Sequence, residues 1–235
     1  MTESPRDAML SHLARLQAMR GSGIHDDAFA RQLLALKAWQ STRLARTYAD
    51  LAAQPRYLPA VDFFLNDLYA PKDFSKRDAE MLRIYPTLVK LLPATAIEMV
   101  GLALELDALS EELDQELAAM MQPGKGKAPL SEARYVEAFR QCGPESRRMR
   151  QVELVREVGM RLDAVAKKTL FNTTLKLLRK PAHMAGLGEL QEFLERGFNA
   201  FRHMKGAEEF LDTVAIRESE IIRRIYSGHP APFSL

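Results

Sequence analysis

Proline and glycine divide this chain into segments in which apolar residues recur every three or four positions, and no segment alternates with a period of two. Recurrence at three and four positions places apolar side chains on one face of an α-helix, whereas alternation would indicate strands. The clearest segment carries Phe29, Leu33 and Leu36, and it ends before Pro55 because the residue preceding proline disfavours the α conformation. The chain is therefore predicted to be all-α.

The same spacing predicts a compact bundle of about nine helices. Their expected ranges are 5–20, 27–53, 58–69, 76–92, 93–121, 131–141, 145–179, 186–203 and 207–226. Pro86 should kink or split the fourth helix near Tyr85, because proline lacks an amide donor and clashes with the preceding turn. Pro181 should interrupt the pattern again, and a further break is expected near Thr169.

One polar stretch is the best candidate for a linker. Residues 122–130 (QPGKGKAPL) place several helix breakers close together. They would separate an N-terminal helical part, residues 1–121, from a C-terminal helical part, residues 131–228, and a frayed tail would follow at 229–235. Either the two parts form two lobes, or the stretch joins two helices of a single domain.

Composition excludes several classes of protein. Lys and Arg total 33 against 31 Asp and Glu, so a formal charge of +2 gives no general reason to bind nucleic acid or anionic lipid. Cys142 is the only cysteine, which precludes an intrachain disulfide and agrees with a cytoplasmic location. The apolar stretches fall short of the roughly 20 residues that a membrane span requires, and the N-terminus lacks a signal-peptide pattern.

Charge is nevertheless distributed unevenly along the chain. Seven acidic residues and no basic ones lie between Glu98 and Glu116, whereas the segment from Glu145 to His183 has ten basic residues against four acidic ones. Near-neutral total charge favours pairing of these two segments inside the fold. Nucleic acid is disfavoured as a partner, because a basic stripe without a recognition motif is weak evidence for it.

Metal and cofactor chemistry has little support in the sequence. Glu98, Glu105 and Glu112 repeat every seven residues and could align carboxylates, but no Glu is followed three positions later by His, as a ferritin-like di-metal site requires. Cys142 lies at a Gly-Pro turn with no His nearby in sequence, which favours an inert thiol. No metal site, cofactor or catalytic residue is predicted.

The most distinctive segment is Asp62–Tyr69. At 100° per residue its other apolar side chains share one helix face with Val61, whereas Phe63 falls on the opposite face between Asn66 and Asp67. Either a second layer of helices buries Phe63, or Phe63 is a surface anchor for a partner. Burial is favoured in general, because large aromatic side chains are mostly buried.

The string Phe63–Tyr69, FFLNDLY, resembles the signature of the bacterial FFLEELY-motif proteins, an uncharacterised helical family. The nearby Asp73-Phe74-Ser75 and Arg77-Asp78-Ala79 also resemble that family. Asn66 and Asp67 stand where the signature has two glutamates, and Asn66 could not supply a carboxylate ligand. The difference favours a structural role for these positions, and the resemblance implies no activity, cofactor or substrate.

The preferred functional hypothesis is a non-enzymatic module that binds another macromolecule, an unidentified protein or a second copy of the chain, through an aromatic surface around the motif. The candidate partner or ligand contacts are Phe63, Phe64, Asn66, Asp67, Tyr69 and Phe74. The alternative is a helical carrier or sensor with an apolar pocket for a lipid-like molecule, lined by Phe63, Phe64, Tyr69, Phe74 or Tyr85.

A carboxylate enzyme is the third hypothesis. Four acids gather near the motif, namely Asp62, Asp67, Asp73 and Asp78. Helix capping accounts for Asp78, and solvent exposure on a helix accounts for the others, so this hypothesis ranks last.

Overall fold

The computed structural model describes residues 4–21, 27–70, 74–91, 94–121 and 130–235. These residues form eleven α-helices and one π-helical turn. In chain order they are α1 (Pro5–Gly21), α2 (Asp27–Thr47), α3 (Ala49–Ala52), α4 (Leu58–Phe63), η1 (Phe64–Leu68), α5 (Ser75–Leu91), α6 (Ala94–Met120), α7 (Glu132–Gln141), α8 (Glu145–Ala166), α9 (Thr169–Met184), α10 (Gly188–Met204) and α11 (Glu208–Tyr226). The predicted all-α class is confirmed.

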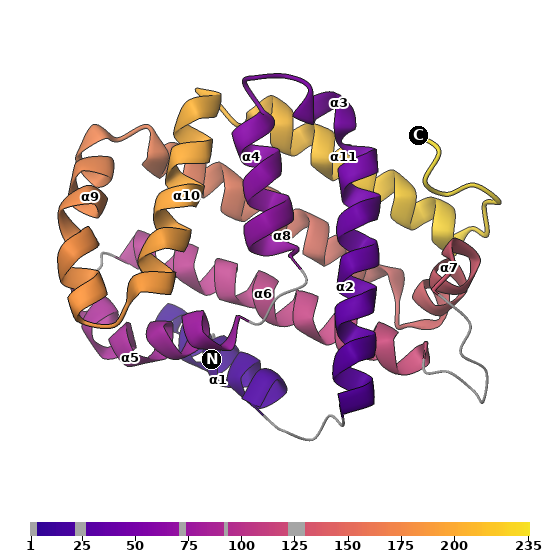
Figure 1. Ribbon diagram of the computed structural model, residues 1–235, viewed down its shortest axis with the longest axis horizontal. Helices are drawn as coiled ribbons and strands as arrows, with labels where there is room; N and C mark the ends of the chain where they lie inside the picture. Colours follow the sequence, from indigo (N-terminus) through magenta and orange to yellow (C-terminus); the bar gives the residue numbers. More distant parts are fainter. Residues whose placement is uncertain (1–3, 22–26, 71–73, 92–93, 122–129) are drawn as a thin grey trace.

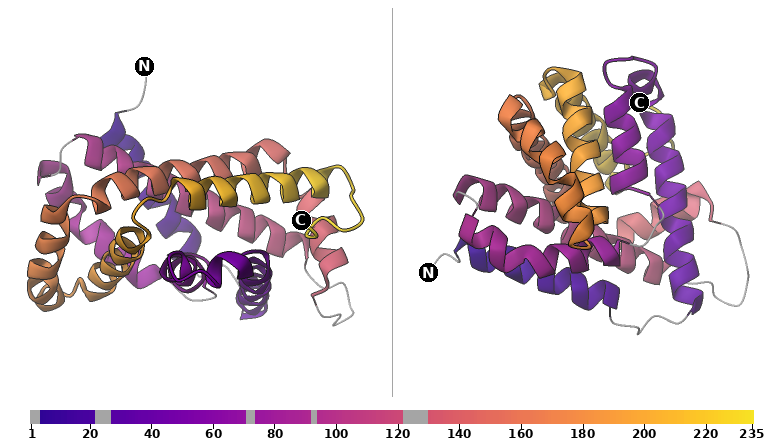
Figure 2. Two further views of the ribbon diagram at one scale, coloured as in Figure 1. Left: turned by 90° about the horizontal axis from the view of Figure 1, so that it is seen from above. Right: turned by 60° about the vertical axis from the view of Figure 1, so that its left-hand side comes forward.

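The helices form two crossing layers (Figures 1 and 2). In one layer α8 lies between α6 and α11, and in the other α4 packs beside α10 while α2 crosses α6. The helix α1 packs along α6 and α5, and the hairpin of α9 and α10 closes one end of the molecule (Figure 1). Within the described ranges, no helix combines the length and apolarity needed to cross a bilayer.

The expected count of about nine helices was slightly low for two local reasons. The segment 27–53 is interrupted at Tyr48, so the short helix α3 follows α2. The segment 145–179 ends its first helix at Ala166 and restarts at Thr169, where the break was expected.

The split that was one of two expectations at Pro86 does not occur, and the interruption expected at Pro181 was wrong. The helix α5 continues through Pro86 and does not split there, and α9 continues through Pro181. A proline inside a helix costs about 3 kcal/mol locally, but α5 packs against α1 and α10, and α9 packs against α8 and α10. Tertiary packing therefore outweighs the local preference at both positions.

The predicted helix at 131–141 agrees with α7. Ser131 is the N-cap, and its hydroxyl accepts a hydrogen bond from the amide of Arg134 at 3.3 Å. The proposed linker before it lies outside the described residues, apart from Leu130.

The prediction that residues 229–235 form a frayed tail was wrong. Phe233 lies 5.9 Å from the ring of Trp39 and 6.2 Å from that of Tyr135, measured between centroids, and Pro232 is buried. The end of the chain therefore packs against α2 and α7.

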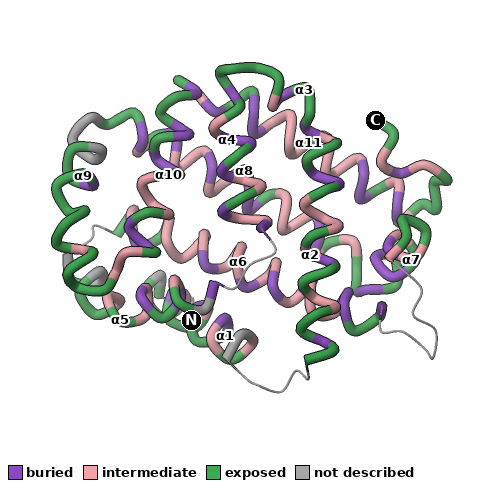
Figure 3. The backbone as a smooth tube through the Cα atoms, viewed as in Figure 1, coloured by how far each residue is buried: buried purple, intermediate pink, exposed green. Residues whose placement is uncertain are grey.

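Buried side chains form three clusters. The first joins α2, α3 and α4 to α8, α10 and α11, the second joins α2, α6, α7 and α11, and the third lies between α1, α5 and α6. Helices from both halves of the chain share the first two clusters. Along α6 and α8, many residues in the middle of the molecule are only half-buried (Figure 3).

Candidate functional site

A cavity of about 350 Å³ lies beside the half-buried residues of α6 and α8 and accounts for their partial exposure. Side chains from α2, α4, η1, α5, α6, α7, α8, α10 and α11 line it, together with Phe233 of the tail. Most of these side chains are apolar. The cavity therefore lies where the two helix layers meet, and helices from both halves of the chain form its wall.

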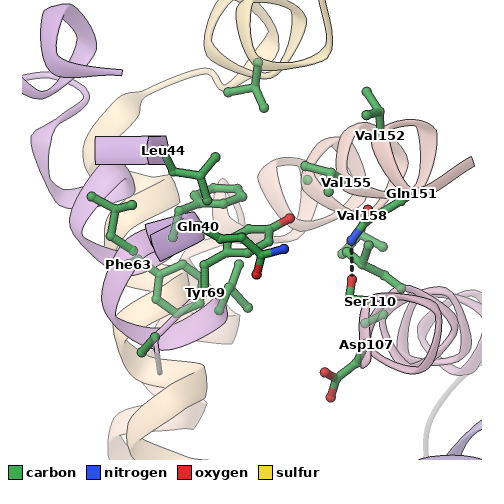
Figure 4. Close-up of a pocket in the computed structure, with 18 of the residues that line it drawn as sticks. Gln40, Leu44, Phe63, Tyr69, Asp107, Ser110, Gln151, Val152, Val155 and Val158 are labelled. Atoms are coloured by element: carbon green, nitrogen blue, oxygen red, sulfur yellow. Dashed lines mark hydrogen bonds between the residues drawn. The ribbon is translucent and has the colours of Figure 1, made fainter. Parts of the chain in front are cut away.

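Two facing walls define the central part of the cavity (Figure 4). One wall, from α2, α4 and the motif, presents Gln40, Leu44, Phe63 and Tyr69. The opposite wall, from α8, presents Gln151, Val152, Val155 and Val158. Aromatic and branched aliphatic side chains thus face each other across the space.

The motif enters this wall through a π-helical turn. The amide of Tyr69 donates to the carbonyl of Phe64 at 2.9 Å, five residues earlier. A π turn inserts one residue relative to an α-helix, and such turns often occur at functional sites. Leu65, Leu68 and Tyr69, which were expected to share a helix face, all line the cavity, while Asp67 is directed to Arg196.

Phe63 is covered by α10. Its side chain is 6% exposed, and its ring lies 5.4 Å from that of Phe193. Gly197 permits this close approach, because a Cβ there would lie 2.9 Å from Cζ of Phe63. The second layer of helices buries Phe63, as one of the two sequence interpretations expected.

One region of the cavity wall is polar and largely paired. Lys37 Nζ donates to Glu111 Oε2 at 2.9 Å, and Gln40 Nε2 donates to Asp114 Oδ1 at 2.9 Å. Glu218 accepts from both Arg43, at 2.5 Å, and the Tyr48 hydroxyl, at 2.7 Å. The three helices α2, α6 and α11 are therefore linked by charged hydrogen bonds beside an apolar space.

Burial changes the acidity of groups in this region. Desolvation raises the pKa of Asp114, although Lys37 and the hydrogen bond from Gln40 oppose the change. Desolvation also raises the pKa of Tyr69, and the nearby carboxylates of Glu218 and Asp114 add to the increase. At both groups desolvation shifts the equilibrium toward the neutral form.

The acidic and basic segments pair as predicted. Arg147 contacts Glu112 at 3.0 Å and Glu116 at 2.7 Å, and Arg150 contacts Glu105 at 3.0 Å. Farther along, Arg161 lies 3.5 Å from Glu98. These ion pairs hold α6 against α8, and inside them Gln151 donates to the Ser110 hydroxyl at 2.8 Å (Figure 4).

The predicted contact residues divide into two groups. Phe63, Phe64, Tyr69 and Phe74 all line the cavity. Asn66 is exposed, and the buried Asp67 binds Arg196 at 2.8 Å. The preferred hypothesis expected an aromatic surface that faces outward. Phe63 and Phe74 are buried, so this expectation is wrong for these two residues.

Of the other candidates, Asp78 also lines the cavity, whereas Tyr85 and Asp62 do not. Tyr85 packs in the cluster between α1, α5 and α6, where its hydroxyl donates to the carbonyl of Arg6 at 3.0 Å. Asp62 is exposed, the buried Asp78 lies 3.4 Å from Arg77, and Asp73 is outside the described residues. Cys142 is buried, and desolvation raises the pKa of its thiol, so this thiol has little nucleophilic character.

Sequence reasoning missed the polar residues of the cavity wall, namely Gln40, Arg43, Arg148, Gln151 and Glu218. Val155, Val158 and Leu162 recur at helical spacing, but this pattern is also typical of an ordinary core stripe. The sequence held a partial signal for these polar wall residues. Arg43 on α2, and Arg148 and Gln151 on α8, each lie at helical spacing from apolar residues of the same helix. Sequence spacing does not indicate whether the space they face is filled.

Comparison with known proteins places the chain in a family without assigning an activity. The family model described as a domain of unknown function (DUF8198) matches residues 21–232, and the chain belongs to that family. No curated protein and no solved structure matches the chain.

Proposed function

We propose that this DUF8198 domain binds a mostly apolar small molecule in its central cavity and serves as a carrier or sensor of it. The observation that carries the proposal is the cavity itself, of about 350 Å³ with predominantly apolar walls. Ligand sites typically measure about 300–1,000 Å³ and combine apolar walls with a few polar groups. An engineered apolar cavity of about 150 Å³ in another protein already binds benzene.

The arrangement of the wall supports this function. Phe63, Phe64 and Tyr69 provide aromatic surface on one side, and Val155 and Val158 provide aliphatic surface on the other. Both the N-terminal and the C-terminal part of the chain contribute, so in this proposal the two parts act as one binding unit.

The proposal is tested by binding measurements on the purified full chain. Native mass spectrometry should show an apolar molecule retained from the expression host, and organic extraction should release it. Ala103→Phe should greatly reduce retention, because Ala103 on α6 lines the cavity. The matched variant is Ala164→Phe, the same change at an exposed position on α8, which should retain the molecule. A wild-type chain that neither carries nor takes up any apolar molecule would contradict the proposal.

The second candidate function is a macromolecular interaction module. In this proposal the contact surface lies on α9 and not around Phe63. On α9, Leu177 and Met184 are 72% and 90% exposed. A second copy of the chain would cover these side chains in this proposal. Sedimentation should then show concentration-dependent association that the double variant Leu177→Ser, Met184→Ser abolishes, whereas a monomer at every concentration would contradict it.

Kinship with the FFLEELY-motif proteins also belongs to the proposal. The string FFLNDLY supports it, since the residues that differ, Asn66 and Asp67, lie off the cavity wall.

A further inference from the structure

Arg148, in the first half of α8, is a buried cation on the cavity wall. Its side chain is 3% exposed. Nη2 donates to the carbonyl of Leu113 at 3.2 Å, and the guanidinium lies 4.3 Å from the ring centroid of Phe139. It also reaches the thiol of Cys142, whose raised pKa keeps that group neutral, and Nε has no hydrogen-bond partner.

Among the described residues, Arg148 differs from the other three cations that line the cavity. Lys37 pairs with Glu111 at 2.9 Å, Arg43 with Glu218 at 2.5 Å, and Arg77 with Asp107 at 2.7 Å. No described carboxylate lies within 4.0 Å of Arg148. An unpaired buried charge is costly, and a binding site for an anion is one way in which such a charge is used.

Asp114 is the acid that could compensate for Arg148 at longer range, because it follows Leu113 on α6. Its carboxyl group can become neutral by taking up a proton, and burial favours that form. A guanidinium cannot lose its proton in a protein. Arg148 therefore keeps its positive charge whatever the protonation state of Asp114, and this guanidinium favours an anionic ligand group over a cationic one.

The positions of the wall residues on α8 give the site a direction. Arg148, Val152, Val155, Gly159 and Leu162 all line the cavity, at the spacing of three and four residues that defines one helix face. At 1.5 Å per residue this face extends roughly 21 Å from the guanidinium. It offers one charged position followed by a continuous apolar track.

We infer that the cavity accepts a long-chain fatty acid, with its carboxylate on the guanidinium of Arg148 and its alkyl chain along Val152, Val155 and Leu162 of α8. The inference rests on the proposed function, since it specifies the class of ligand for the same cavity. A carboxylate matches the planar donor edge of one guanidinium, and the resulting charged hydrogen bonds are about twice as strong as neutral ones.

The test compares three probes of equal chain length, namely palmitate, hexadecanol and hexadecylamine, on the delipidated full chain. Trp39, the only tryptophan, reports binding by fluorescence, because it stacks 4.1 Å from Tyr135 on the cavity wall. Palmitate should bind at least about tenfold more tightly than hexadecanol. Arg148→Met should remove this preference and leave hexadecanol affinity almost unchanged, whereas Arg148→Lys should keep part of it.

Arg150→Met is the matched control, because Arg150 lies two residues away, pairs with Glu105 and does not line the cavity. It should leave both affinities unchanged. Equal binding of palmitate and hexadecanol to the wild-type chain would overturn the fatty-acid inference while leaving the proposed function intact. A preference for hexadecylamine would overturn it in favour of Asp114 as the recognition group. Failure of all three probes to bind would also overturn the fatty-acid inference, and the mass-spectrometric retention test would then decide the proposed function separately. If Arg148→Met does not fold, the fatty-acid inference is still tested by the preference of the wild-type chain among the three probes and by the reduced preference of Arg148→Lys.

Discussion

Phe63 rests directly on the backbone of α10 at Gly197, where a Cβ atom would lie 2.9 Å from Cζ of the ring. An ordinary Gly→Ala change inside a helix stabilises it by about 1 kcal/mol. Here the added methyl must displace a buried ring, and such overpacking costs about 1–3 kcal/mol. Gly197→Ala should therefore lower the free energy of unfolding, as measured by urea denaturation.

The double variant Phe63→Leu, Gly197→Ala provides the control. The smaller side chain removes the clash, so the loss caused by Gly197→Ala should shrink in the Phe63→Leu background. Equal losses in both backgrounds would mean that the two residues do not interact.

Filling the cavity should stabilise the protein. Ala103 lines the cavity, whereas Ala108, on the same helix, is fully buried in the cluster with α1. Ala103→Leu should raise the free energy of unfolding by about 0.5–2 kcal/mol, as cavity-filling changes commonly do. Ala108→Leu should lower it by about 1–3 kcal/mol, because no space is available there. Thermal and urea unfolding of the ligand-free chain measure both effects, and comparable destabilisation by the two variants would argue that the space at Ala103 is closed in solution.

The two motif positions that differ from FFLEELY should tolerate glutamate unequally. Asn66 is exposed, so Asn66→Glu should change stability by no more than about 0.5 kcal/mol. Asp67 is 5% exposed, and both of its carboxylate oxygens accept from Arg196 Nε, at 3.0 and 3.1 Å. The extra methylene of Asp67→Glu must therefore fit into a packed site and should cost about 1–3 kcal/mol. Urea unfolding of both variants under one condition is the measurement, and an unaffected Asp67→Glu would show that the ion pair relaxes freely.

Features that follow from the chemistry of particular side chains could be predicted from the sequence. The predicted range 131–141 begins at the residue that caps α7, where the Ser131 hydroxyl accepts from an amide three residues away. The pairing of α6 with α8 followed from the opposite charge of Glu105 and Arg150 on long helices. In both cases the chemistry of the side chains already indicates the partner.

The cavity could not be predicted in this way. Periodicity shows that Val155 and Val158 face an apolar environment, but a filled core and an open space give the same pattern. The burial of Phe63 depends on Gly197, which is far away in sequence, and on a π turn that α-helical periodicity does not include. The unpaired state of Arg148 likewise depends on where every other helix lies.

The half-buried Asp114 should make part of the stability depend on pH. Desolvation raises its pKa above the ordinary value of 3.8, so between 3.8 and the raised value the native chain binds more protons than the unfolded chain. The contribution of Asp114 to stability therefore falls as pH rises through this window. Asp114→Asn keeps the acceptor for Gln40 but cannot ionise. Relative to the wild type it should gain stability with rising pH, up to the raised pKa, and then hold that gain.

Asp50 is the matched control, because its pKa is shifted in the opposite direction. Hydrogen bonds from Arg217 lower the pKa of this half-exposed carboxyl group below 3.8. Its contribution is present above 3.8 and is lost as pH falls through the lowered pKa, and solvent screening limits it to about 1 kcal/mol or less. Asp50→Asn should therefore be less stable than the wild type at neutral pH and equal to it in acid. Chemical denaturation of all three chains between acid and neutral pH gives both curves. A loss of stability at neutral pH for Asp114→Asn as well would mean that its charge is compensated in the folded protein, by Lys37 first and by Arg148 in addition.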